Sequence, residues 1–265
     1  MFFCSFFALL TKTYRSIFNT FFMKSIKVHT TPSTNLYLRE LYRANPNIKN
    51  CYVVAENQTN GRGQMGANWI SQEGKNLTFS VLLEGLNLKI ENQFKLSAIT
   101  SLAILKVLKQ LGITNLKVKW PNDILAESLK ICGVLIENMY SNQKINASII
   151  GIGLNVNQED FDKMYRASSL KQLTGIHYDL DYVLKKLVKQ IEADIYEFLP
   201  YSIEAILEKY HENLFRIGKA STFEFPNGER TTGIIKKVSK QGLLEILFED
   251  HILKSFEIKE IKLLY

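Results

Sequence analysis

Short apolar runs and period-two alternation recur through roughly the first 160 positions, and both patterns predict β-strands. Polar segments and segments with helical spacing separate these runs, so strands and helices are expected to alternate with loops. The strands are expected at Ile26–His29, Cys51–Ala55, Leu77–Leu83, Leu116–Trp120, Lys130–Asn138 and Ala147–Asn157. Strands mixed with helices in this way predict an α+β fold.

Apolar residues at helical spacing predict four helices. They are expected from Leu36 to about Tyr42, over Phe94–Leu111, from Val183 to Ile195 and over Ile203–Leu214. Gly112 is expected to end the second helix, Asp181 to cap the third and Ser202 to begin the fourth. After Phe215 the pattern changes again, because short strands follow one another with turns between them. These are Ser221–Phe225, Thr231–Val238, Leu243–Phe248 and Ile252–Ile258, and they predict a small barrel.

Polar clusters stand where several of these strands and helices begin or end, which is how ligand sites are commonly built. The clusters are Ser33-Thr34-Asn35, Gln58 with Gly61–Gly66, Lys119–Asp123 with Lys130, and Asn155. The alternative for Ser33, Thr34 and Asn35 is that they only cap the helix that follows.

The loop Gly61-Arg62-Gly63-Gln64-Met65-Gly66 matches the pattern G-x-G-x-x-G. A dinucleotide-binding fingerprint must open a helix directly, and no helical period follows here. A phosphate-binding loop of the Walker type is excluded as well, because no Gly-Lys-Ser/Thr closes the run. We therefore interpret it as another kind of anion-binding loop, in which Arg62 grips a carboxylate or phosphate. An ordinary flexible surface loop is the alternative.

The side chains of these clusters suit reaction at a phosphate. Arg62, Lys119 and Lys130 supply positive charge, and Asp123 is a ligand for a hard cation such as Mg²⁺. No nucleophile–base pair accompanies them, and none of the four histidines lies in a cluster. Cys132 falls in an apolar strand and is expected in the core. Sites of this composition act by positioning and charge neutralisation.

Composition narrows the class of protein only slightly. The formal charge of +7 and pI of about 9.1 are typical of proteins that meet anions, but no run of five Lys or Arg is present. Cys4, Cys51 and Cys132 are widely spaced, so neither a disulfide framework nor a zinc site is indicated. We therefore expect a cytoplasmic protein.

The first 22 residues form an unusual leader that is rich in phenylalanine. Its apolar run Phe2–Leu10 is shorter than the roughly 20 residues that span a bilayer, and its basic residues follow that run, unlike those of a signal peptide. We expect that residues 1–22 are a non-native or unstructured leader and that Met23 is the true start. A weak membrane-surface anchor is the alternative.

Taken together and in order, these motifs resemble those of the biotin protein ligases. They are Ser33-Thr34-Asn35, Gly61–Gly66 with Trp69, Lys119-Trp120-Pro121-Asn122-Asp123, Lys130-x-x-Gly133 and Gly151-Ile-Gly-Leu-Asn155. The resemblance implies an α+β catalytic domain with a mixed sheet of the class II synthetase type over residues 23–214. It also implies an SH3-like barrel over residues 215–265. The implied reaction uses biotin and ATP with Mg²⁺, forms biotinyl-5′-AMP, and transfers biotin to a lysine of a carboxylase carrier domain.

The resemblance also implies a role for each motif residue. The biotin-binding residues would be Ser33, Thr34, Asn35, Gln58, Arg62, Gly63, Gln64, Lys130 and Gly133. The ATP-binding residues would be Arg62, Trp69, Lys119, Asn122 and Asn155. Lys130, Arg62, Lys119 and Asp123 would be catalytic, with Asp123 also holding Mg²⁺. Trp69 and Trp120 have a simpler alternative as core aromatics, which we favour for Trp120.

One departure from the family pattern stands in the glycine loop, where some members have a second arginine and this chain has Gln64. One cation fewer implies a looser hold on the adenylate, or a loop that relies on its backbone amides.

Two other functions compete with biotin ligation. A lipoate or octanoate ligase shares the fold, but the pair of Lys119–Asp123 and Gly61–Gly63 motifs favours biotin. A biotin-responsive repressor needs a DNA-binding domain of about 60 residues, and the catalytic pattern already begins at Lys24. Residues 215–265 hold nine Lys/Arg against seven Asp/Glu, so they do not suggest a nucleic-acid surface. We expect no nucleic-acid or membrane partner, and a monomer or homodimer.

Overall fold

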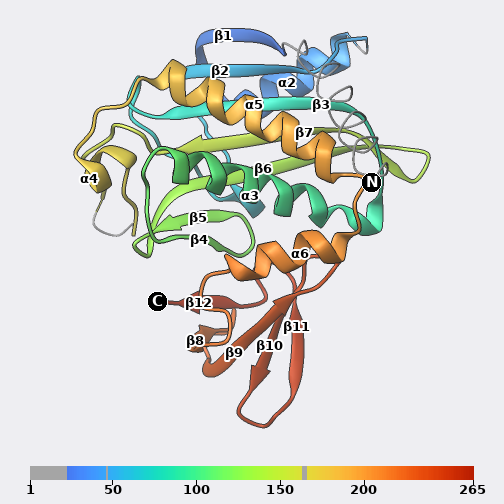
Figure 1. Ribbon diagram of the computed structural model, residues 1–265, viewed down its shortest axis with the longest axis vertical. Coiled ribbons are helices and arrows are strands. Elements are labelled where there is room, and N and C mark those ends of the chain that lie inside the picture. Colours follow the sequence, from blue (N-terminus) through green and yellow to red (C-terminus); the bar gives the residue numbers. More distant parts are fainter. Residues whose placement is uncertain (1–22, 46, 163–165) are drawn as a thin grey trace, which may run out of the picture.

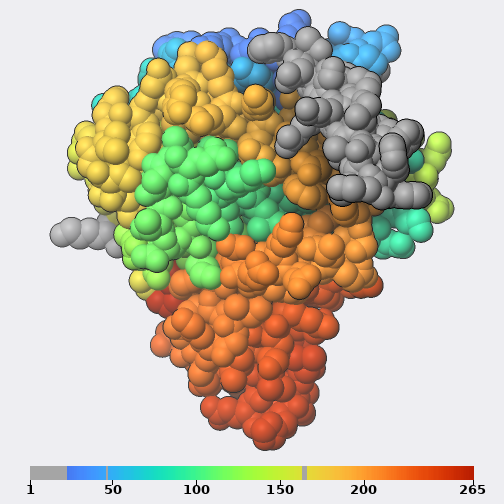
Figure 2. Space-filling model, in the orientation of Figure 1, coloured from blue at the N-terminus to red at the C-terminus, as the bar shows by residue number. Residues whose placement is uncertain are grey.

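The computed structural model describes residues 23–45, 47–162 and 166–265, and its strands form two separate sheets (Figure 1). The expectations for the leader fall on residues 1–22, which lie outside the described residues. The larger sheet carries helices on both faces, and the smaller sheet forms the lobe at the opposite end of the molecule from β1 (Figures 1 and 2).

The larger sheet has seven strands in the order β1-β2-β3-β7-β6-β5-β4. They are β1 (Lys24–Thr31), β2 (Cys51–Gln58), β3 (Leu77–Lys89), β4 (Leu116–Lys119), β5 (Asp123–Ala126), β6 (Leu129–Ser141) and β7 (Lys144–Leu154). The β1–β2 pair is parallel and the other neighbouring pairs are antiparallel, so the predicted mixed sheet is confirmed. All six expected strands are present. The seventh, β5, was not predicted because it has only four residues and directly follows the turn at Pro121 and Asn122.

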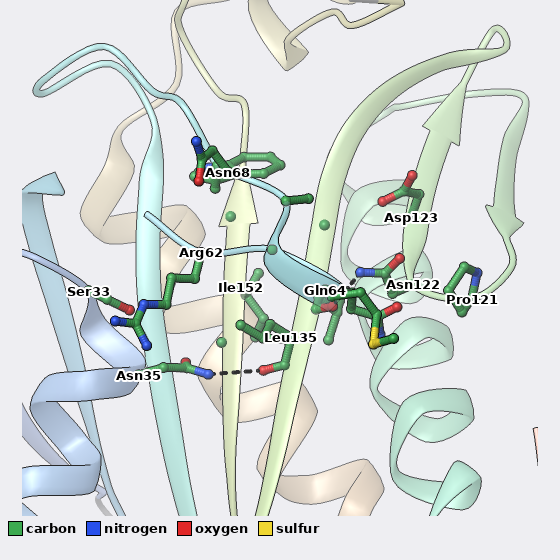
Figure 3. A pocket seen from close by; sticks show the side chains of 18 of the residues that line it. Ser33, Asn35, Arg62, Gln64, Asn68, Pro121, Asn122, Asp123, Leu135 and Ile152 are labelled. Atoms are coloured by element: carbon green, nitrogen blue, oxygen red, sulfur yellow. Dashed lines mark hydrogen bonds between the residues drawn. The ribbon is translucent and has the colours of Figure 1, made fainter. Parts of the chain in front are cut away.

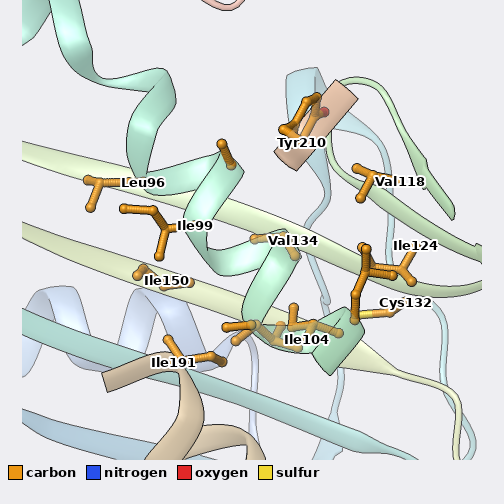
Figure 4. Close-up of a cluster of buried hydrophobic side chains, with 14 of the residues drawn as sticks. Leu96, Ile99, Ile104, Val118, Ile124, Cys132, Val134, Ile150, Ile191 and Tyr210 are labelled. Atoms are coloured by element: carbon orange, nitrogen blue, oxygen red, sulfur yellow. The ribbon is translucent and has the colours of Figure 1, made fainter. Parts of the chain in front are cut away.

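One face of the larger sheet carries the main hydrophobic core. Helices α3 (Phe94–Gln110) and α5 (Leu180–Phe198) lie across this face (Figure 1). α3 is apolar on nearly every side because it packs between the sheet, α5 and α6 (Ile203–Glu212). Figure 4 shows Ile99, Ile150 and Ile191 meeting in this layer. Cys132 is fully buried there, as predicted.

The opposite face of the sheet is only partly covered. Helix α2 (Thr34–Ala44) packs on β2, β3 and β7, where Leu38 contacts a second, smaller apolar cluster that includes Val53 and Leu82. Two short 3₁₀ turns, η1 (Gln64–Gly66) and η2 (Ile90–Asn92), and the short helix α4 (Leu170–Thr174) complete the helical elements of the described ranges. Because α2 packs mainly on β2, β3 and β7 and reaches β6 through the side chains of Asn35 and Arg39, part of the face formed by β6 and the adjoining β7 stays available for a ligand site.

The predicted cap of the third helix was wrong by two residues. Asp179, not Asp181, stands at the N-terminus of α5, where its carboxylate accepts a hydrogen bond from the backbone N–H of Tyr182 at 3.2 Å. Asp181 lies in the first turn and forms an exposed ion pair with Lys27 at 2.8 Å. Two aspartates stood close together at this boundary, and sequence spacing alone did not distinguish them.

The smaller sheet has five strands in the order β11-β10-β9-β8-β12. They are β8 (Ala220–Glu224), β9 (Arg230–Val238), β10 (Leu244–Phe248), β11 (Leu253–Phe256) and β12 (Lys262–Leu264). The four expected strands are confirmed, and the sheet is consistent with an SH3-like unit. The expected closure into a barrel is absent from the described strands, because β11 and β12 remain at the two edges. β12 has three residues, and all of them pair with β8.

The two sheets are joined by specific contacts between distant segments. The indole N–H of Trp120 donates to the carbonyl of Gly242 at 2.8 Å, and Trp120 is buried, as predicted. Val238 N donates to the ring of His211 at 2.9 Å, which links β9 to α6. Gly242 has φ of +91°, and a Cβ there would lie 2.6 Å from the ring of Phe94. The smaller sheet therefore shares the main core, which includes Phe223 and Ile235, and is held beside β4.

Tyr210 offers a test of this core. Its side chain is fully buried with its ring 5.4 Å from that of Phe94, and its hydroxyl has no hydrogen-bond partner among the described residues. A buried unsatisfied hydroxyl destabilises a fold, so Tyr210→Phe is expected to raise the free energy of unfolding by about 1 kcal/mol in urea denaturation.

Tyr178 is the matched control, since its hydroxyl donates to Leu111 O or to Thr174 Oγ1. Tyr178→Phe is expected to lower the free energy of unfolding by about 1 kcal/mol. Destabilisation by Tyr210→Phe of the same size as by Tyr178→Phe would mean that the Tyr210 hydroxyl has a partner.

Candidate functional site

A cavity of about 250 Å³ lies on the partly covered face of the larger sheet, beneath the glycine loop (Figure 3). Segments from α2, β2, β6 and β7 and from the turn before β5 contribute to its wall. Twelve residues that the sequence analysis assigned to biotin or ATP, or to catalysis, line it together. They are Ser33, Thr34, Asn35, Gln58, Arg62, Gly63, Gln64, Trp69, Asn122, Asp123, Lys130 and Gly133. The fold therefore brings motifs from four distant parts of the chain to one cavity.

The start of α2 supplies hydroxyl and amide groups. Ser33 is at the N-cap position, but its side chain makes no capping hydrogen bond, so the capping alternative is not realised for it. Instead, Thr34 donates to Gln58 Oε1 from its backbone N–H at 2.8 Å and from its hydroxyl at 3.1 Å. Ser80 Oγ lies 2.7 Å from Thr34 Oγ1 and 2.6 Å from Asn35 Oδ1. The hydroxyl and amide groups at this end of the cavity are therefore held in place by their own hydrogen bonds.

The side-chain amide of Asn35 is oriented by hydrogen bonds to β6. Its Nδ2 donates to Glu137 Oε2 at 2.8 Å and to Leu135 O at 3.3 Å (Figure 3), and the Glu137 carboxylate is paired with Arg39. Sequence analysis missed Ser80 and Glu137. The available signal was a polar or charged residue inside an otherwise apolar strand, which indicates a special partner.

Glycines on β6 and β7 allow side chains to lie directly on the sheet. A Cβ on Gly151 would be 2.2 Å from Asn35 Oδ1, and one on Gly153 would be 2.2 Å from Trp69 Cε2. Gly133 pairs with Gly153 across the strands, and a Cβ there would be 3.2 Å from Trp69 Cζ3. The Gly-Ile-Gly motif is therefore a floor for Asn35 and Trp69.

Two buried polar atoms in the cavity wall have neither a hydrogen-bond partner nor an ion-pair partner among the described residues. The indole Nε1 of Trp69 and the side-chain Oε1 of Gln64 make no hydrogen bond to any residue that the structure describes. Native proteins pair nearly all buried polar groups, so unpaired groups that line a cavity indicate a bound ligand. Trp69 thus lines a site rather than the core. Its backbone N–H donates to Gly61 O at 2.9 Å, which ties it to the glycine loop.

Lys130 and Asp123 form the charged end of the cavity, with Lys130 Nζ 2.7 Å from Asp123 Oδ1. The Lys130 ammonium also lies 5.5 Å from the centre of the Trp69 ring. The Lys130 backbone is held by hydrogen bonds to Arg166 O at 2.8 Å and from Ser168 N at 3.0 Å. A cation backed by one carboxylate and an aromatic ring is suited to stabilising developing negative charge.

The donor set for Mg²⁺ consists of Asp123 alone. No cluster of three His, Cys, Asp or Glu side chains that would hold a metal occurs in the described part of the chain. Mg²⁺ usually keeps several waters and binds through one or two carboxylates and the phosphates of its substrate. One carboxylate in the cavity wall therefore fits a Mg²⁺ ion that arrives with a nucleotide.

Lys119 does not line this cavity. It lines a second cavity of about 470 Å³ between the Trp120 segment and the smaller sheet, and the two cavities share Pro121, Ile258 and Lys259 as wall residues. Burial lowers the pKa of Lys119, and the Asp123 carboxylate partly opposes this effect. Lys119 Nζ lies 5.3 Å from the centre of the Tyr265 ring.

Asn155 lies outside both cavities. It is buried, and its Nδ2 donates to Ser168 O at 3.0 Å. Since Ser168 N donates to Lys130 O, Asn155 supports the backbone of Lys130 rather than facing the ligand space. Its assignment to ATP has no support from this geometry.

The glycine loop covers the cavity. Gly63 N donates to Ala67 O at 2.6 Å and Arg62 pairs with Asn68, so the loop folds back on itself around η1. The Arg62 side chain extends from the loop toward Ser33 and Asn35 (Figure 3).

Among the described helices, none is long and apolar enough to cross a membrane.

Comparison with known proteins is consistent with this site. The model of the Biotin/lipoate A/B protein ligase family matches residues 27–155. The chain is 31% identical over 158 residues to the bifunctional ligase/repressor BirA of Bacillus subtilis, which covers 58% of this chain and 48% of that protein. It is 28% identical over 220 residues to the biotin–[acetyl-CoA-carboxylase] ligase of Mycobacterium tuberculosis, covering 82% of this chain and 80% of that one. The chain spans about half the length of the first of these relatives.

A solved structure extends the likeness to nearly the whole chain. The biotin protein ligase of Aquifex aeolicus, in complex with biotin and ATP, superposes with a TM-score of 0.75 and 30% sequence identity. The match covers 91% of this chain and 99% of that one. With this coverage, and with the family motifs gathered around one cavity, the chain belongs to the biotin protein ligases of the Biotin/lipoate A/B protein ligase family.

Proposed function

We propose that this protein is an ATP-dependent ligase that activates biotin as biotinyl-5′-AMP and transfers it to a lysine of a carrier domain. One observation carries the proposal: a single cavity joins a polar end at α2, toward which Arg62 extends, to a charged end formed by Lys130 and Asp123. Biotin has the same two-part character, a ureido ring at one end and a carboxylate at the other.

The polar end suits the ureido ring. The hydroxyls of Ser33 and Thr34 and the amides of Asn35 and Gln58 offer both donors and acceptors. The Ser80 and Glu137 hydrogen bonds hold these groups before a ligand arrives, which reduces the entropy lost on binding. A lipoyl ring has no N–H or carbonyl group to pair with them, so this end favours biotin over lipoate.

The charged end suits adenylate formation. A biotin carboxylate oxygen forms a bond to the α-phosphorus of ATP, the bond to the β-phosphate oxygen breaks, and pyrophosphate leaves. Lys130 stabilises the charge that develops on the phosphate oxygens, and Asp123 holds Lys130 in position. We assign Arg62, which the covering loop carries into the same cavity, to the biotin carboxylate and the phosphate. Mg²⁺ supplies charge neutralisation at the phosphates when it is bound, and we assign Asp123 as its protein ligand. Trp69 and Asn122 contribute the wall on the nucleotide side.

Transfer needs no nucleophile from the enzyme. The amine of the acceptor lysine forms a bond to the acyl carbon, the bond between that carbon and the phosphate oxygen breaks, and AMP leaves as the amine loses a proton. Relatives named for acetyl-CoA carboxylase support a carboxylase carrier domain as the acceptor. Cys51 and Cys132 are free and buried, and burial raises the pKa of the Cys51 thiol to about 11, which keeps this thiol protonated and unreactive. Free thiols are typical of a reducing compartment, so we place the protein in the cytoplasm.

The experiment follows both steps with the full chain. Pyrophosphate release is measured with ATP and either biotin or lipoate, and biotin transfer to an isolated carrier domain is then measured by mass. We expect release with biotin, little release with lipoate, and the added mass of one biotinyl group. A carrier domain with its acceptor lysine replaced by arginine is the control. Release with lipoate but not with biotin would assign the protein to the lipoate ligases instead.

A further inference from the structure

Lys259 reaches the glycine loop from the far end of the chain. It stands in the turn between β11 and β12, with φ of +73°. The turn is tied by a hydrogen bond from Glu257 N to Glu260 Oε2 at 2.7 Å and one from Glu260 N to Glu257 O at 3.3 Å. Lysine rarely takes a positive φ, so these hydrogen bonds hold the residue in an otherwise unfavourable conformation.

The Lys259 ammonium meets the loop at a defined atom. Its Nζ donates a hydrogen bond to the carbonyl oxygen of Met65, within η1. Met65 directly follows Gln64, whose buried Oε1 has no hydrogen-bond partner among the described residues. The turn between β11 and β12 therefore places a cation against the loop, close to a polar group that has no partner.

Lys259 also lies where the two cavities meet, because both include it in their walls. The cations that line the first cavity are Arg62, Lys130 and Lys259, and Lys130 is already paired with Asp123. The second cavity adds Lys119 and Lys262, and its wall also includes Glu224, whose carboxylate lies 3.7 Å from Lys262 Nζ. Lysines still outnumber this one carboxylate in the wall of the second cavity. Positive charge thus continues from the reacting end of the first cavity toward the gap between the sheets, a path suited to a polyphosphate.

We propose that Lys259 is a phosphate-binding residue that adds a second cation, beside Arg62, to the glycine loop. This inference rests on the proposed function. An ammonium group has three donors. One is given to the Met65 carbonyl, and the others face the leaving β- and γ-phosphates of ATP. Glu257 and Glu260 are the carboxylates nearest in sequence, and the Glu260 carboxylate accepts a hydrogen bond from the turn itself. Lys259 would then bind the leaving group and hold the loop over it.

The test compares Lys259→Met, Lys259→Arg and the control Lys236→Met, which removes an exposed lysine of β9 in the same sheet. The KM for ATP in pyrophosphate release is expected to rise about tenfold or more in Lys259→Met, since a hydrogen bond to a charged group is lost. The KM for biotin should stay at the wild-type value. Lys259→Arg should restore most of the ATP affinity, and Lys236→Met should match the wild type.

A second measurement separates this inference from the proposed function. ATP is titrated against each variant by calorimetry with biotinol present, an alcohol analogue that lacks the reacting carboxylate. A wild-type affinity for ATP in Lys259→Met would overturn the phosphate-binding role. Faster trypsin cleavage after Arg62 in that variant would not rescue the role, because it would show only that Lys259 holds the loop in place. Wild-type protein that neither binds ATP nor releases pyrophosphate would overturn the proposed function, and this role with it.

Discussion

Lys130→Ala is expected to lower the rate of biotin-dependent pyrophosphate release by about 100- to 1000-fold, the loss usual for removing one preorganised group that stabilises developing charge. The Lys130 ammonium is held by its ion pair with Asp123 at 2.7 Å. The backbone N–H and carbonyl of Lys130 are both hydrogen-bonded as well, so the charge is fixed in position. The rate is measured at saturating ATP and biotin, so that an effect on binding does not hide the effect on chemistry.

The fold should survive this change. The Lys130 side chain is 35% exposed, so loss of its ion pair with Asp123 is expected to cost about 1 kcal/mol of stability, small enough for normal expression. Lys189→Ala, an exposed lysine of α5, is the matched control and should leave both rate and stability unchanged. A Lys130→Ala protein that is folded and releases pyrophosphate at close to the control rate would remove Lys130 from the mechanism.

Gly153→Ala is expected to displace the Trp69 indole and to raise the KM for ATP by about tenfold or more, since overpacking of this kind costs about 1–3 kcal/mol. The added Cβ would lie 2.2, 2.6 and 2.7 Å from three carbon atoms of the ring. These atoms belong to a rigid aromatic system, so the indole has to move as a unit. The displacement is read from tryptophan fluorescence in a Trp120→Phe background, where Trp69 is the only indole left.

A double-mutant cycle assigns the cause. If the collision with Trp69 explains the effect, Gly153→Ala should add little to the loss already caused by Trp69→Ala, and the two changes will be strongly non-additive. Additive effects would show instead that Gly153 serves the strand itself, independently of the indole above it.

Much of the larger sheet could be predicted because its strands are continuous apolar runs, and such runs must be buried wherever the chain folds. β5 was missed because its four residues, Asp-Ile-Leu-Ala, do not alternate as those of β4 do and form no longer apolar run. The same limit affects the smaller sheet, where strands were predicted but their closure was not. Pairing between strands depends on which edges meet, and β11 and β12 do not meet.

The candidate site could also be predicted only in part from the sequence. Its motif residues could be named because glycines, cations and amides at strand ends are visible in the sequence. Their surroundings could not, because Glu137 touches Asn35 and Lys259 touches Met65 across separations of 102 and 194 residues. Asn155 carries a family motif, but its amide turns away from the cavity to Ser168.

The sequence by itself predicted the candidate site residues, most of the strands and helices, and the family that the motifs resemble. Local composition suffices for these, since apolar period, turn residues and charge act within a few positions. Only the tertiary structure decided which motif residues share a cavity, why Gly151 and Gly153 are glycines, and where the smaller sheet contributes a lysine. Those features depend on packing between residues far apart in the chain, which no local pattern records.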